Sequence, residues 1–180
     1  MTSFDITDYR YNSHLTYPTV DNVTTFPMVQ GIKSEEARTA ENESNVLSIL
    51  TKFDTWVHPQ NNSLWFAAGL RLTAFKALDI DAVAVIGVDP DVSLGLFARA
   101  VFSFPPKGTT FVHVELGIAC RLIFKEGLFT AEASLSPNSY VLVPACRLSG
   151  GLAICYWFDP SPYAGDFVLS VSLNFVYFGQ

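Results

Sequence analysis

The sequence predicts a mainly β protein: an antiparallel meander of long amphipathic strands that forms a sandwich or a curled, barrel-like sheet, with one short helix near 44–54. Three observations support this fold class. Large apolar residues occupy every second position in four long segments between residues 64 and 124. Short runs rich in Pro, Gly and Asp separate these segments, and connections this short join antiparallel neighbours. Apolar residues recur at a clear helical spacing only near 44–54.

The four alternating segments are the main elements of the predicted sheet, and they cover residues 64–74, 78–88, 92–104 and 112–124. In each segment the even-numbered residues are apolar, whereas polar residues such as Asp79 and Ser93 stand at odd positions. Successive side chains of a strand point to opposite faces of the sheet. We therefore expect the even residues to share a common interior and the odd residues to face solvent.

The remaining strands follow from shorter patterns in the second half of the chain. Apolar residues alternate again over 129–135 and 167–177, a short strand is expected at 140–143, and another crosses Gly150-Gly151 over 148–158. Turns rich in proline, such as Ser136-Pro137-Asn138-Ser139, separate these elements. The total is about eight strands in one β-rich domain over residues 44–180.

Residues 1–43 are expected to form an extended arm and a loose polar segment, anchored by Phe26, Met28 and Val29. The helix near 44–54 presents Val46, Ile49, Leu50 and Phe53 on one side. Eleven helical residues are only about 16 Å long, whereas four paired strands span roughly 19 Å by 40 Å. Either the second half of the chain folds over the apolar face, or that face stays open.

The composition indicates extensive apolar contact and excludes some partners. The chain of 180 residues is 49% hydrophobic and only 16% charged, below the roughly 25% charged residues of ordinary soluble domains. A net charge of −6 argues against nucleic acid, which needs a basic surface. No apolar run reaches the roughly 18 residues of a membrane helix. The polar N-terminus lacks a signal core, so a cytoplasmic, non-transmembrane protein is expected.

Motifs for catalysis are absent from the sequence, and the residues that could carry chemistry are few. His113 and Glu115 share one strand face and are weak candidates for acid–base work. If Arg71, Arg99 and Arg121 align with them, the patch could bind a carboxylate. The interpretation we favour is a solvated sheet face with cross-strand ion pairs. Asp79 and Asp81 lack a third ligand, so we expect no metal site, and no cofactor motif is present.

Several motifs, taken together in order, resemble one stretch of the large microbial proteins that carry the domain of unknown function numbered six-six-zero-three. They are Phe26-Pro27 with Val29-Gln30-Gly31, Trp65-Phe66-Ala67-Ala68-Gly69, Leu135-Ser136-Pro137-Asn138-Ser139-Tyr140 and Ala164-Gly165-Asp166-Phe167-Val168. The similarity covers about residues 25 to 170. Those proteins are typically far longer, so the resemblance implies one segment of a larger β-rich architecture or a short relative. It supplies no catalytic residues.

From these features we expect a non-catalytic β-module that contacts an apolar ligand, lipid or isoprenoid-like, or a protein partner. A homo-oligomer or a place in a larger β-assembly fits the same pattern. The alternative is a small cavity-type enzyme, a hydrolase or cyclase, with polar residues at the mouth of an apolar pocket. The residues expected to bind the apolar ligand are Phe66, Leu70, Ile86, Leu96, Phe102, Leu116, Ile118, Ile154, Leu169 and Val171.

Overall fold

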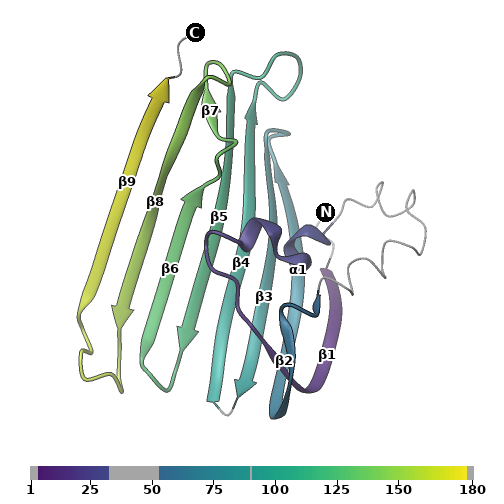
Figure 1. The fold of residues 1–180 in the computed structure, drawn as a ribbon, viewed down its shortest axis with the longest axis vertical. Coiled ribbons are helices and arrows are strands. Elements are labelled where there is room, and N and C mark those ends of the chain that lie inside the picture. Colours follow the sequence, from purple (N-terminus) through teal and green to yellow (C-terminus); the bar gives the residue numbers. More distant parts are fainter. Residues whose placement is uncertain (1–3, 33–52, 90, 178–180) are drawn as a thin grey trace.

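The computed structural model describes residues 4–32, 53–89 and 91–177 and shows one antiparallel sheet of nine strands (Figure 1). The strands are β1 (Phe4–Leu15), β2 (Val57–Ala74), β3 (Leu78–Asp89), β4 (Asp91–Phe104), β5 (Val112–Ile123), β6 (Leu128–Leu135), β7 (Tyr140–Val141), β8 (Cys146–Trp157) and β9 (Phe167–Tyr177). A 3-10 turn, η1 (Val23–Thr25), and a single helical turn, α1 (Pro27–Gln30), follow β1. The predicted mainly β meander is confirmed.

The strands lie side by side almost in chain order. The sheet runs from β1 to β6 and continues with β8 and then β9, while the short β7 pairs with the ends of β5 and β8. The described strands form one sheet, which curls towards its β1–β2 side in Figure 1. Of the two predicted arrangements, a curled single sheet therefore describes the fold and a sandwich of two sheets does not.

The register places all the alternating apolar residues on one face, which we call the apolar face. Even residues of neighbouring strands pair from β2 to β5, as Phe66 does with Ile86 and Leu96 with Cys120. Beyond β5 the parity alternates from strand to strand. Even residues of β5 pair with odd residues of β6, odd residues of β6 pair with even residues of β8, and even residues of β8 pair with odd residues of β9. The parity expected for 64–124 is therefore correct.

The core, however, lies on the opposite face, so the expectation that the even residues form the interior is wrong. Odd residues in the middle of the strands, Trp65, Val83, Val85, Phe97 and Ala119, are at most 5% exposed. They pack against Leu15, Val23, Phe26 and Val29 from residues 15–32, a segment that we call the N-terminal cover. On the apolar face, by contrast, Phe66 is 42% and Leu96 44% exposed.

The physical reason is that the sheet has apolar side chains on both faces at its centre. Alternation reports that one face is more apolar, but burial also requires a covering segment. The N-terminal cover lies over the odd residues, on the face turned to the viewer in Figure 1. Phe26 and Val29 anchor this segment as predicted, since they are 0% and 1% exposed.

The remaining predictions about the chain have mixed outcomes. The predicted helix near 44–54 falls almost entirely outside the described residues. The helical turn α1 was not predicted; it begins at Pro27, a position where the fixed φ of proline suits a helix start. The three cysteines, Cys120, Cys146 and Cys155, are free and half-buried. Within the described ranges, no helix has the length and apolar character needed to cross a membrane.

Candidate functional site

The apolar face is the larger of two candidate surfaces. All ten residues expected to bind an apolar ligand lie on it, because the register pairs the residues of this face with one another across each neighbouring pair of strands from β2 to β9. Six of them are exposed: Phe66, Ile86, Leu96, Phe102, Leu169 and Val171. The other four, Leu70, Leu116, Ile118 and Ile154, are half-buried. The structure therefore brings these side chains together on an open surface.

Charge is absent from this face across the described strands from Leu64 onwards, where every position is apolar or glycine except for the two tyrosines, Tyr156 and Tyr177. Exposure is highest at β9, an edge strand that pairs only with β8 among the described strands. Phe167, Val171 and Phe175 of β9 are 67–70% exposed, against 37–46% for Phe66, Ile86, Leu96 and Phe102 in β2–β4. The apolar face thus extends to the edge of the sheet.

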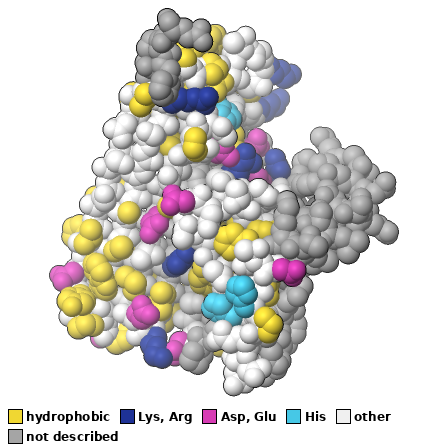
Figure 2. Space-filling view, viewed as in Figure 1, with side chains coloured by type: hydrophobic (Ala, Val, Ile, Leu, Met, Phe, Trp, Pro, Cys, Tyr) yellow, Lys and Arg dark blue, Asp and Glu magenta, His cyan; other side chains and the backbone are white. Residues whose placement is uncertain are grey.

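The opposite face, which we call the covered face, carries a ladder of alternating charges beside the N-terminal cover. Arg71 pairs with Asp81 across β2 and β3, and their side chains lie 3.5 Å apart. Asp81 in turn stands opposite Arg99 of β4 in the register. Arg99 Nε donates a 2.5 Å hydrogen bond to Glu115 Oε1 of β5. Figure 2 shows basic and acidic side chains next to one another on this face. The expected cross-strand ion pairs are present, but the expectation of a solvated face is wrong here, because Asp81 and Glu115 are only 9% and 6% exposed.

The two carboxylates of this ladder experience opposite environments. Burial raises the pKa of Asp81, and the charges of Arg71 and Arg99 offset only part of that effect. For Glu115, burial acts in the same direction, but the hydrogen bond and charge of Arg99, with hydrogen bonds from Asn138 and Ser136, hold its pKa below the ordinary value. Glu115 is therefore a well-satisfied carboxylate, whereas the buried Oδ1 of Asp81 accepts no hydrogen bond within the described structure.

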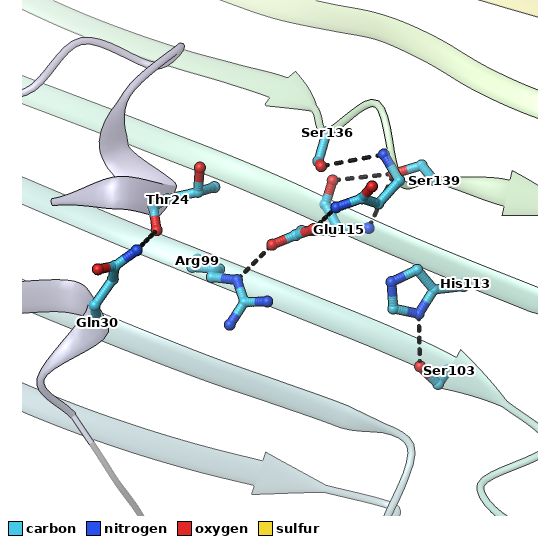
Figure 3. Close-up of polar contacts among 9 residues, drawn as sticks. Thr24, Gln30, Arg99, Ser103, His113, Glu115, Ser136 and Ser139 are labelled. Carbon is cyan, nitrogen blue, oxygen red and sulfur yellow. Dashed lines mark hydrogen bonds and ion pairs between the residues drawn. The ribbon is translucent and has the colours of Figure 1, made fainter.

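His113 and Glu115, the weak catalytic candidates, have separate partners (Figure 3). The Nδ1 atom of His113 lies 3.0 Å from Ser103 Oγ, and its ring stacks on Tyr140 at 5.7 Å between centroids. Nucleophilic catalysis would need a third group that orients the histidine. The two oxygens of Glu115 instead accept hydrogen bonds from Arg99 and Asn138.

The other charged residues singled out from the sequence have local partners. Asp79 Oδ1 accepts a 2.7 Å hydrogen bond from Thr73 Oγ1 on the neighbouring strand β2. Arg121 does not join the charge ladder. Its Nη2 atom donates to the backbone oxygens of Pro18, at 2.7 Å, and Tyr17, at 3.3 Å, in the N-terminal cover.

Sequence reasoning missed the polar contacts that Ser13 of β1 and Tyr17 of the N-terminal cover make with β2 and β4. The hydroxyl groups of Tyr17 and Ser93 lie 2.9 Å apart, and the Nε1 atom of Trp65 donates a 3.1 Å hydrogen bond to Ser13 Oγ. These pairs are separated by 76 and 52 residues. The turn-rich composition of residues 16–31 offered no signal for such contacts; only the apolar Phe26, Met28 and Val29 indicated that the segment docks somewhere.

The fold and these surfaces define a class: an all-β protein built on one open sheet, with a charged, covered face and an exposed apolar face. The family model described as a family of unknown function, DUF6603, matches residues 10–171. The chain therefore belongs to the DUF6603 family, and the resemblance noted in its sequence is confirmed. Searches among curated proteins and among solved structures found no match.

Proposed function

We propose that this chain is a non-catalytic β-module that packs its apolar face against an apolar surface of a protein partner. The observation that carries the proposal is the unbroken apolar face from β2 to β9, on which Phe66, Ile86, Leu96 and Phe102 of β2–β4 are exposed. Contiguous exposed apolar surface of this kind marks an interaction site in soluble proteins. The partner surface would be the face of another sheet, supplied by a separate protein or by a larger β-assembly.

The size of the face favours a macromolecular partner over a small ligand. Seven long strands, β2–β6, β8 and β9, span about 29 Å from first to last at the usual strand spacing, and twelve residues extend about 40 Å. The resulting footprint is on the order of 1,100 Å². Stable protein interfaces bury about 800 Å² on each partner, and sheets pack face to face at about 10 Å. A ligand pocket would instead be concave.

An apolar ligand such as a lipid or isoprenoid chain is the second candidate. It is favoured by the row of exposed side chains along β9, where Phe167, Leu169, Val171, Leu173 and Phe175 form a strip without charge. An acyl chain lying along this strip would remove apolar surface from water without requiring a complementary protein surface. Both candidates use the same face, so they must be separated by experiment.

A site-specific photo-crosslinker at position 96, in the middle of the apolar face, tests the proposal directly. The matched control is a crosslinker at position 75, because Phe75 is 94% exposed but lies in the turn between β2 and β3, outside the face. We expect adducts to one defined protein from position 96 and none from position 75. Organic extraction of the purified protein, followed by mass spectrometry, detects any bound lipid or isoprenoid, the second candidate ligand.

Substitution then shows whether the face carries the interaction. The double variant Ile86→Asp/Leu96→Asp places two charges on the apolar face and should abolish the adducts seen with a crosslinker at position 102. Phe75→Asp should leave them unchanged, since aspartate tolerates the positive φ of 55° at this turn position. A wild-type protein that is monomeric, free of lipid and equally reactive from positions 96 and 75 would refute the proposal.

A further inference from the structure

A cavity of about 300 Å³ lies on the covered face, between the start of the N-terminal cover and the strands β2–β5. Its walls include His14, Thr16, Tyr17, Ser63, Ser93 and Arg121, and the backbone of Gly87 also borders it. Its volume is at the lower end of the roughly 300–1,000 Å³ typical of small-molecule sites. Leu64 is the one residue of the apolar face among those that line the cavity, and neither Arg99 nor Glu115 lines it.

The lining combines one permanent positive charge with neutral hydroxyl groups. Arg121 is its guanidinium, Thr16, Tyr17, Ser63 and Ser93 supply hydroxyl groups, and no aspartate or glutamate is among the residues that border the cavity. This is unusual for a chain with 17 acidic and 11 basic residues. The cavity therefore presents a local positive charge in a protein whose overall field is negative.

Arg121 is held in place without a carboxylate partner. Among the described residues the ion pairs are Arg71–Asp81, Arg99–Glu115 and Lys125–Asp91, and Arg121 is in none of them. Its Nη2 atom donates to the carbonyl oxygens of Tyr17 and Pro18, and its guanidinium lies 5.9 Å from the centre of the Tyr17 ring. These contacts orient the guanidinium without pairing it with a carboxylate from the part of the chain that the structure describes. An anion is the chemical group that would compensate it.

The hydroxyl groups are oriented too. Tyr17 Oη and Ser93 Oγ lie 2.9 Å apart. A Cβ atom at Gly87 would stand 2.6 Å from Tyr17 Oη and 3.0 Å from Ser93 Oγ, so the absence of a side chain at this position lets the hydroxyl pair sit against β3. Burial raises the pKa of Tyr17, although Ser93 and Arg121 act against that rise. The phenol thus stays a neutral hydrogen-bond donor at neutral pH.

We propose that this cavity binds a small organic anion, a carboxylate or a phosphate ester, with Arg121 contacting the anionic group and the hydroxyl groups of Tyr17 and Ser93 contacting polar atoms of its body. Guanidinium groups suit both oxyanions because their N–H groups match the spacing of two anionic oxygens. The cavity volume of about 300 Å³ corresponds to roughly ten water molecules, so the ligand must be small.

Titration of the purified full chain with three probes tests the proposal: benzoate, phenyl phosphate and the uncharged benzyl alcohol. Binding is measured by calorimetry and by tryptophan fluorescence, since Trp65, one of the three tryptophans of the chain, borders the cavity. We expect benzoate or phenyl phosphate to bind and benzyl alcohol to bind at least tenfold more weakly, since a hydrogen bond to a charged group is lost. The stronger of the two anions identifies the class of oxyanion.

Two variants and a matched control locate the site. Arg121→Gln should weaken anion binding about tenfold or more, and Thr16→Trp should block the cavity from an exposed position without removing the charge. Arg147→Gln is the control, because Arg147 also donates to a proline carbonyl, that of Pro137, but lies away from the cavity. Should Arg121→Gln fail to fold, Thr16→Trp alone decides.

Two results would overturn the proposal: no binding of either anion at 10 mM (roughly the weakest affinity worth calling a site), or binding that Arg121→Gln and Thr16→Trp leave unchanged. If Arg147→Gln weakened anion binding as much as Arg121→Gln does, the anions would be responding to the overall charge of the protein, which would also overturn the proposal. The apolar face is not touched by any of these variants, so this test is independent of the proposed protein partner.

Discussion

Arg99 and Glu115 form the shortest side-chain contact of the covered face, a 2.5 Å hydrogen bond from Nε to Oε1, although they are not directly opposite in the register. Arg99 stands opposite Gly117, and Glu115 stands opposite Val101, so the pair is diagonal. The backbone N–H of Glu115 donates to Ser139 Oγ at 3.0 Å, and that hydroxyl donates to the Glu115 carbonyl oxygen at 3.1 Å. One glutamate therefore connects β4 and β5 to the loop before β7.

Glu115→Gln should destabilise the protein at neutral pH and not at low pH. The pKa of Glu115 is lowered in the folded state. The stability that it contributes is therefore present above its unfolded value and is lost as the pH falls through the lower folded value. We expect the free energy of unfolding to fall by about 1–2 kcal/mol at pH 7. The effect is no larger than this because Arg99 is partly exposed and solvent screens the pair. Urea unfolding from pH 7 to pH 3 measures it, and wild type and variant should converge at the acidic end.

Asp91→Asn is the control for this measurement, because Asp91 pairs with Lys125 at an exposed site. Exposed ion pairs contribute about 0–1 kcal/mol, so this variant should differ little from wild type at any pH. A loss in Asp91→Asn equal to that in Glu115→Gln would mean that the two carboxylates are equivalent, contrary to the structure.

Asp81→Asn should have the opposite dependence on pH. Burial raises the pKa of Asp81, so the folded state binds the proton more tightly than the unfolded state does. The ionised carboxylate lowers the free energy of unfolding. This destabilisation is absent below the pKa that Asp81 has in the unfolded state and grows as the pH rises through its pKa in the folded state. The variant should therefore gain stability relative to wild type between pH 3 and pH 7. A relative loss over the same range would contradict the assignment.

Phe97→Ala and Phe102→Ala separate the two faces of β4. Phe97 is 0% exposed beneath the N-terminal cover, where its ring packs on Tyr17 and Phe26, whereas Phe102 is 37% exposed on the apolar face. We expect a loss of about 3–5 kcal/mol for Phe97→Ala, since it leaves a cavity in the core, and a clearly smaller loss for Phe102→Ala. Urea melts of the two variants give the comparison. Equal losses would show that both faces are buried in solution.

Ser13→Ala should destabilise the junction between β1 and β2. The Trp65 indole donates its N–H to Ser13 Oγ, and Trp65 is 2% exposed, so the variant leaves a buried donor without a partner. Such a group costs about 1–3 kcal/mol. In a Trp65→Phe background the same substitution should cost less, because the donor is gone. If the double-mutant cycle showed no coupling between positions 13 and 65, this hydrogen bond would not contribute to stability.

The sequence was sufficient for the strands after residue 64 and their parity, but not for β1, which was expected to be part of an extended arm, or for the choice of buried face. Period-two alternation at Leu64–Ala74 and Val92–Phe104 determines which side chains share a face, and short connections such as Pro105-Pro106-Lys107-Gly108 determine the order of neighbours. Which face is covered depends on a segment distant in the chain. Residues 15–32 show neither alternation nor helical spacing, so their docking on Val83 and Phe97 could not be read from a local pattern.

The candidate site was predictable to a similar extent. Arg71 and Arg99 share the parity of Asp81 and Glu115, which was enough to expect cross-strand ion pairs. The cavity beside Arg121 was not foreseen, because it depends on Tyr17 and on the small residues Gly87 and Ser93 meeting there. Side chains on one sheet can be aligned from register alone, whereas a cavity needs the path of the covering chain.

The N-terminal cover also determines the order in which the molecule can fold. Strand pairs from β2 to β6 join chain neighbours, whereas Tyr17 meets Ser93 across 76 residues and Pro18 meets Arg121 across 103. Contacts between distant residues require closure of a long loop and form late. During synthesis, residues 15–32 are translated before β2–β5, so their docking surface is incomplete until β5 has been made. Phe26 and Val29 therefore stay in water while strands β2–β5 are translated, and the hairpins of the sheet can form before the core closes.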